Sequence, residues 1–85
     1  MDSSARDFLV QLLETPSPSG YEQPVQQVIH NYIANFADQV NRDVHGNLIA
    51  VKNPDAPLRV MLAGHCDQIG MLVSHVDEDG FLYAQ

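Results

Sequence analysis

The chain has 85 residues, of which 45% are hydrophobic and 18% are charged, and its four Lys and Arg against eleven Asp and Glu give a formal net charge of −7 at pH 7. This composition is typical of an ordered globular chain of at most one domain, and the acidic balance argues against nucleic-acid or membrane partners, because both require clustered Lys and Arg. One cysteine cannot form an intrachain disulfide, and no signal-peptide pattern or apolar run of about 18 residues occurs, so a cytoplasmic protein is expected.

Two amphipathic helices are expected in the first half of the chain. Apolar residues recur three and four positions apart over residues 4–14, where Ser4 and Asp7 have the spacing of a capping box. The same spacing over residues 24–36 predicts the second helix, with a proline in its first turn. Two prolines and a glycine in the connecting segment 15–20 predict a tight loop.

Five strands are expected in the second half, where the apolar period changes to two. Two hairpins are predicted, one on either side of a continuous apolar run that indicates a buried central strand. The expected strands cover residues 40–44, 48–52, 58–63, 71–76 and 81–83. The predicted order is therefore ααβββββ, in an α/β fold.

The segment Gly64–Gly70 holds the most informative side chains of the chain. It leaves the end of the expected central strand, which is where ligand sites form in α/β sheets. In extended chain His65 and Asp67 project to the same side, so the carboxylate could fix the tautomer of a metal-binding imidazole or bind a metal itself. Taken alone, an H-x-D sequence is a weak signal and more often a hydrogen-bonded surface pair at the end of a strand.

Four segments in order resemble the M42 family of metallo-aminopeptidases. Residues 16–22, Pro-Ser-Pro-Ser-Gly-Tyr-Glu, are similar to that family's P-G-x-S-G-x-E loop, and residues 43–48 stand in the place of its D-x-x-G-N-hydrophobic segment. Residues 64–70, Gly-His-Cys-Asp-Gln-Ile-Gly, look like its H-M-D-E-I-G motif, and residues 71–82 match its following strand and G-F-hydrophobic sequence. Cys66 replaces the usual Met and Gln68 a frequent Glu.

The resemblance implies the N-terminal part of a di-zinc exopeptidase-like catalytic domain, incomplete within residues 1–85, with residues of about 70–85 leading towards an inserted smaller domain. His65 would be a ligand to one of two divalent metal ions, zinc or cobalt, and Asp67 the catalytic-site carboxylate that orients it. The implied enzyme removes N-terminal residues from peptides and is a homo-oligomer at full length. The isolated chain should be inactive, because the resemblance places the other ligands and the general base after these residues.

Three alternatives stay open at this point. A related di-zinc amidohydrolase or carboxypeptidase would also place H-x-D after a central strand. A non-enzymatic α+β interaction module could carry the pair incidentally. Cys66 could itself bind zinc as a thiolate, although alternation directs it away from its two neighbours. The remaining histidines lack partners at ligand spacing and are expected to be structural or solvated.

Overall fold

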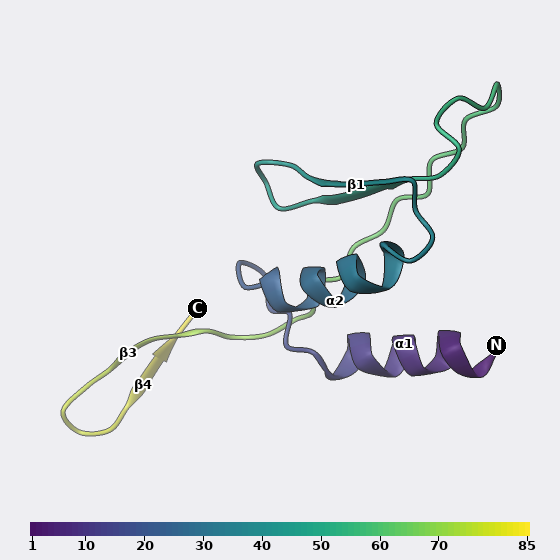
Figure 1. Cartoon of the computed structure of the whole chain (residues 1–85). Coiled ribbons are helices and arrows are strands. Elements are labelled where there is room, and N and C mark those ends of the chain that lie inside the picture. Colours follow the sequence, from purple (N-terminus) through teal and green to yellow (C-terminus); the bar gives the residue numbers. More distant parts are fainter.

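The computed structural model describes residues 1–85 and contains two helices followed by four strands (Figure 1). The class is α+β, in the order ααββββ, so the predicted α/β order ααβββββ is wrong by one strand. Both sheets are two-stranded and antiparallel, and the only parallel pairing is a single bridge between Pro18 and Gln68. The elements are α1 (Ser3–Glu14), α2 (Gln23–Ile33), β1 (Gln39–Arg42), β2 (Leu48–Val51), β3 (Val73–Val76) and β4 (Leu82–Ala84).

The cap of α1 differs from the predicted capping box of Ser4 and Asp7. The helix begins one residue before Ser4, because the carboxylate of Asp2 accepts a hydrogen bond of 2.7 Å from the backbone N–H of Ala5. Asp is a favoured N-cap residue for this bond, which satisfies one of the free N–H groups of the first turn. The predicted end of the helix at Glu14 is confirmed.

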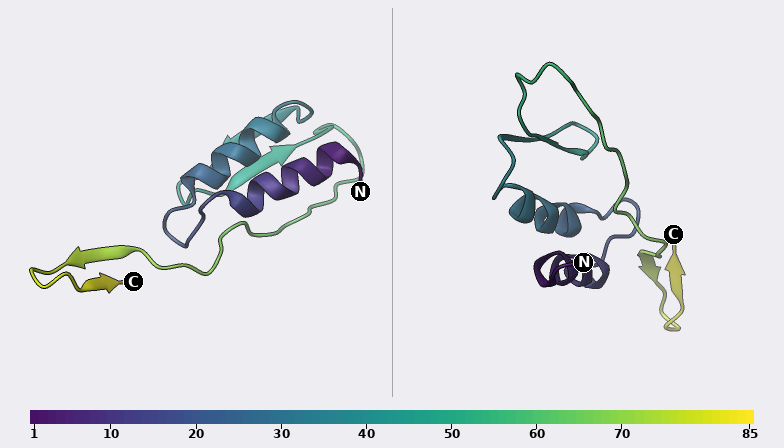
Figure 2. Two further views of the ribbon diagram at one scale, coloured as in Figure 1. Left: turned by 90° about the horizontal axis from the view of Figure 1, so that it is seen from below. Right: turned by 90° about the vertical axis from the view of Figure 1, so that its right-hand side faces the viewer.

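Helix α2 lies between α1 and the β1–β2 hairpin, so this part of the chain has three layers (Figures 1 and 2). Phe8 of α1 stacks on Tyr32 of α2 with ring centroids 3.8 Å apart and planes 8° from parallel. Phe36 meets the edge of the same Tyr32 ring just after the helix has ended. The core is small, because Val25 is the only hydrophobic residue that is fully buried, at 1% exposure.

The β1–β2 hairpin is closed by a turn that one carboxylate organises. Asp43 accepts hydrogen bonds from the backbone N–H groups of His45 and Asn47, at 3.0 and 2.9 Å, and from the Asn47 side-chain amide at 2.7 Å. Gly46 has a φ of +90°, a conformation that favours glycine. The predicted hairpin is confirmed, although β1 stops two residues before Val44.

The β3–β4 hairpin uses the same turn. Asp77 accepts from the backbone N–H groups of Asp79 and Phe81, both at 2.9 Å, and Gly80 has a φ of +86°. Both turns therefore have Asp at the first position and Gly at the fourth, with backbone bonds of the same kind closing them. The second predicted hairpin is also confirmed, with β3 and β4 in antiparallel register and an irregularity between Val73 and His75.

The expected central strand over Leu58–Ala63 is not formed. The segment runs without strand pairing, and its large apolar side chains are between 76% and 94% exposed. A strand requires a hydrogen-bonded neighbour, and each of the four strands present pairs only within its own hairpin. Apolar character alone therefore did not produce a strand among these residues.

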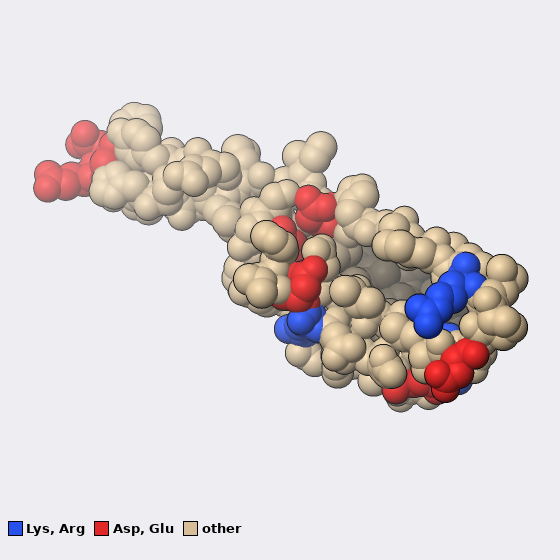
Figure 3. All heavy atoms as spheres, turned by 90° about the horizontal axis from the view of Figure 1, so that it is seen from above, with Lys and Arg blue, Asp and Glu red and all other residues tan.

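The β3–β4 hairpin projects away from the layered part of the chain (Figures 1 and 2). The molecule measures 62 × 32 × 17 Å as a result. Acidic atoms gather at the far end of this projection, where the turn carries Asp77, Glu78 and Asp79 (Figure 3). Neither helix is long and apolar enough to cross a membrane.

Candidate functional site

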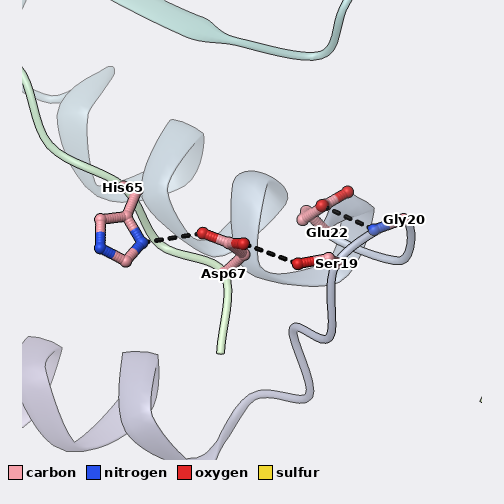
Figure 4. Close-up of polar contacts among 5 residues, drawn as sticks. All are labelled: Ser19, Gly20, Glu22, His65 and Asp67. Carbon is pink, nitrogen blue, oxygen red and sulfur yellow. Dashed lines mark hydrogen bonds and ion pairs between the residues drawn. The ribbon is translucent and has the colours of Figure 1, made fainter. Parts of the chain in front are cut away.

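His65 and Asp67 lie together in the segment that follows residues 58–63 (Figure 4). Nδ1 of His65 is 2.8 Å from Oδ1 of Asp67, so the expected adjacency of the two side chains is present. The segment is extended although it follows no strand, and side-chain alternation is sufficient to bring residues two apart to one side. Their metal-binding and catalytic roles stay predictions.

Ser19 is a third member of this arrangement that the sequence did not predict. Its hydroxyl donates a hydrogen bond of 2.7 Å to Oδ2 of Asp67 (Figure 4). Both oxygens of the carboxylate are thus engaged, one by an imidazole and the other by a hydroxyl. Ser19 is 48 positions from Asp67 in the sequence, so no spacing rule could have linked them.

The loop that carries Ser19 is docked on the H-x-D segment by its main chain. The backbone N–H of Gln68 donates a hydrogen bond to the carbonyl of Ser17 at 2.8 Å. Pro18 and Gln68 form an isolated parallel β-bridge. Gly70 permits this close approach, since a Cβ at position 70 would lie only 2.8 Å from the Cβ of Pro18. The two segments, similar to separate motifs of one family, are therefore in direct contact.

Hydrogen bonding determines the charge state of Asp67 and the tautomer of His65. The hydroxyl of Ser19, and then the imidazole of His65, hold the pKa of Asp67 below its ordinary value. An ionised carboxylate only accepts hydrogen bonds, so Nδ1 of His65 carries the proton. In the neutral imidazole Nε2 is then the nitrogen without a proton, on a side chain that is 85% exposed.

A hollow of about 140 Å³ lies beside this arrangement. Three segments meet around it: the start of α2, the β1–β2 turn and the H-x-D segment. The amide of Gln26 fastens the turn to the helix by donating to the carbonyl of Gly46 at 2.9 Å. The lining contains carboxylates, imidazoles and a thiol but no Lys or Arg, a composition that favours a cationic occupant. The lining residues are Glu22, Gln26, His45, Gly46, Asn47, His65, Cys66 and Asp67.

Cys66 also lines this hollow and is partly buried. Burial raises the pKa of its thiol, and the negative charge of Asp67 raises that pKa further. Whether its side chain is directed away from His65 and Asp67 stays a prediction.

The donor set fits one ligand of a metal site. A metal-binding histidine commonly donates its other ring N–H to a carboxylate, and His65 does so while its Nε2 is free. Among the 85 residues no three His, Cys, Asp or Glu side chains converge as a metal site. A catalytic zinc site typically takes three protein ligands, and these residues do not supply such a set.

Sequence reasoning missed the lining role of Glu22 and His45. Glu22 belongs to the family-like loop at residues 16–22, and its carboxylate accepts a 2.7 Å hydrogen bond from the backbone N–H of Gly20 (Figure 4). His45 is one of the histidines expected to be structural or solvated, and it lies in the β1–β2 turn and lines the hollow. Only the resemblance of both segments to one family could have suggested that they meet.

Comparison with known proteins gives a family and several relatives. Residues 46–85 match the family of M42 glutamyl aminopeptidases. A lysyl aminopeptidase of Pyrococcus furiosus is 38% identical over 77 residues, which are 89% of this chain and 22% of that protein. The putative aminopeptidase FrvX of Escherichia coli is 36% identical over 76 residues, which are 89% of this chain and 21% of that protein.

A LysW-lysine hydrolase of Deinococcus radiodurans is 32% identical over 83 residues, which are 96% of this chain and 23% of that protein. The chain thus spans between a fifth and a quarter of the length of these curated relatives. The resemblance to M42 peptidases that the four sequence segments predict is confirmed.

Proposed function

Because this chain is related to the M42 aminopeptidases, we propose that residues 1–85 form the N-terminal part of the catalytic domain of a metal-dependent aminopeptidase. The complete enzyme hydrolyses N-terminal residues from peptides. In this assignment the β3–β4 hairpin, within residues of about 70–85, leads towards an inserted smaller domain. The domain has the di-zinc exopeptidase fold, in which chain outside residues 1–85 pairs with the open segment 58–63.

His65 and Asp67 have distinct roles in this proposal. His65 binds one of two divalent ions, zinc or cobalt, through Nε2. Asp67 holds the ring by accepting the Nδ1 proton at 2.8 Å, which fixes the tautomer that leaves Nε2 available. When bound, such ions supply Lewis-acid activation of water and of the scissile carbonyl.

The observation that carries the proposal is the engaged carboxylate beside a free imidazole nitrogen. The pair lines a hollow without Lys or Arg, next to two loops that resemble the same family. An incidental surface pair of His65 and Asp67 does not account for the hydrogen bond from Ser19 to Asp67 or for the contact of the Ser19 loop with Gln68. The family resemblance implies that the remaining ligands and the general base lie outside residues 1–85, so these residues alone are expected to be inactive.

His65→Ala in the complete protein tests the proposal. Loss of this ligand should remove bound metal and abolish hydrolysis of aminoacyl substrates, because both ions are needed to stabilise charge at the carbonyl. Metal content by elemental analysis and the aminopeptidase rate are measured together. His30→Ala is the matched control, since His30 lies on α2 and does not line the hollow. A fully active His65→Ala protein with two metals bound would refute the assignment.

A second candidate follows from the names of other relatives. One is named a LysW-lysine hydrolase and three are named putative LysW-lysine/LysW-ornithine hydrolases, at 32% to 36% identity over 73% to 96% of this chain. In this second candidate the complete protein is a related hydrolase that acts on LysW-lysine or LysW-ornithine. Assaying one preparation on aminoacyl peptides and on LysW-lysine separates the two candidates.

A non-enzymatic interaction module is the remaining alternative. It predicts that the complete protein binds no metal and hydrolyses neither substrate. The cytoplasmic location and the homo-oligomer of the full-length protein are further expectations, which fractionation of cells and sedimentation of the complete protein would test.

A further inference from the structure

Ser19 is the side chain best placed to act on the proposed metal ligand without touching the metal. Its hydroxyl is 2.7 Å from Oδ2 of Asp67, and the other oxygen of that carboxylate is 2.8 Å from Nδ1 of His65 (Figure 4). The three groups form a chain of two hydrogen bonds that ends at the free Nε2.

A carboxylate that held only the imidazole could rotate about its Cβ–Cγ bond. Asp67 is partly exposed, with 39% of its side chain accessible, so packing alone does not fix its orientation. A second bond on the opposite oxygen removes that freedom. The hydroxyl of Ser19 therefore sets the direction in which Oδ1 faces His65.

The position of Ser19 is itself set by the backbone. Gln68, next to Asp67, donates its N–H to the carbonyl of Ser17, two residues before Ser19. Pro18 contacts the same segment closely enough to require glycine at position 70. These two contacts fix the position of the loop relative to Asp67.

From these contacts we infer that Ser19 is a positioning residue, which orients the Asp67 carboxylate and through it the metal-binding nitrogen of His65. The inference rests on the proposed function, since it assumes that His65 binds a metal. It predicts that the hydroxyl at position 19, and not the bulk of the side chain, is what metal affinity depends on.

Two substitutions of nearly equal volume separate hydroxyl from bulk. In the complete protein, Ser19→Thr keeps a hydroxyl and Ser19→Val replaces it by a methyl group. Zinc affinity is measured by competition with a chelator, and the thermal unfolding midpoint is recorded for each variant. Ser19→Val should weaken zinc binding about 10-fold, the lower end for partners that orient a ligand, and Ser19→Thr should bind within about two-fold of the original protein.

Ser17→Ala is the matched control within the same loop. The hydroxyl of Ser17 is buried and has no hydrogen-bond partner in the protein, and the substitution keeps the carbonyl that accepts from Gln68. Zinc affinity should be unchanged in this variant. Equal weakening by Ser17→Ala and Ser19→Val would overturn the inference, because the effect would then belong to the loop as a whole.

A double-mutant cycle with Asp67→Asn asks whether Ser19 acts through the carboxylate. If it does, Ser19→Val should add less than about two-fold to the loss that Asp67→Asn already causes, since contacting residues in one network are not additive. Independent, multiplying losses would overturn the inference.

The His65→Ala protein distinguishes failure of the inference from failure of the proposed function. If His65→Ala loses metal while Ser19→Val and Ser19→Thr bind zinc equally, Ser19 is not a positioning residue but the proposed site stands. If His65→Ala retains its metal, the proposed site fails, and the inference fails with it.

Discussion

Gly70→Ala tests whether the contact between the loop and the H-x-D segment determines the geometry of the site. A Cβ at position 70 would lie 2.8 Å from the Cβ of Pro18, where ordinary contact begins at 3.4 Å. Pro18 would have to retreat by roughly 0.6 Å, because its ring cannot swing aside as a flexible side chain would. Overpacking of this kind costs about 1–3 kcal/mol of the free energy of unfolding.

The same displacement should reach the site. Ser19 follows Pro18 directly, and its hydroxyl lies 2.7 Å from Asp67. A retreat of roughly 0.6 Å along that bond would exceed the range of about 2.5–3.0 Å for an O–H···O hydrogen bond. We therefore expect Gly70→Ala to lower both the thermal unfolding midpoint and the zinc affinity of the complete protein.

Gly64→Ala is the control for Gly70→Ala. Gly64 lies at the other end of the H-x-D segment, a Cβ there would meet no atom within 4 Å, and its φ is not positive. Replacement of glycine at such a position is neutral or stabilising by about 0.4–1 kcal/mol. Combining Gly70→Ala with Pro18→Gly should recover part of the loss. If the Gly70→Ala and Gly64→Ala proteins have equal stability and zinc affinity, the reasoning from the close contact is refuted.

Three further outcomes are expected. Asp67→Asn should weaken zinc binding in the complete protein about 10- to 100-fold in a chelator competition assay, and unchanged binding would contradict its orienting role. Cys66→Met, which introduces the residue usual in the family, should leave the hydrolytic rate nearly unchanged, whereas an inactive variant would identify the thiol as a ligand. The side-chain amide of Asn47 is the main cause of the lowered pKa of Asp43, so the stabilisation of this turn should be fully present above the ordinary pKa of 3.8 and disappear as the pH falls through the lower pKa of the folded state. Protection of the Asn47 side-chain amide in NMR spectra measures this loss, and protection that persists in Asp43→Ala would contradict it.

The sequence was sufficient for elements whose causes are local. Both hairpins were predicted from an apolar period of two on either side of a turn that contains glycine, and the contacts that close each turn join residues at most four apart. The helices were predicted from their apolar spacing, with the cap of α1 misplaced because Asp2 and Ser4 are both acceptable N-cap residues. In the structure Asp2 is the N-cap, because its carboxylate accepts a hydrogen bond from the N–H of Ala5.

Features that depend on distant partners were not predicted. The apolar run at residues 58–63 has the composition of a central strand, but composition supplies no neighbouring strand. The adjacency of His65 and Asp67 followed from alternation, whereas the bond from Ser19 joins residues far apart in the chain and has no local signal. Sequence periodicity therefore located two of the three side chains of the candidate site and missed the one that arrives from another loop.

The short turns of the two hairpins should form before the contact between Ser19 and Asp67, because they close much shorter loops. Each Asp-to-Gly turn closes a loop of about four residues, and β-hairpins form within about 1–10 μs. The contact between Ser19 and Asp67 closes a loop of 48 residues, which costs about 2 kcal/mol more closure entropy than a four-residue turn. The hairpins should therefore exist in a growing or refolding chain before His65 acquires its orientation, and competence for metal binding should be gained late in folding.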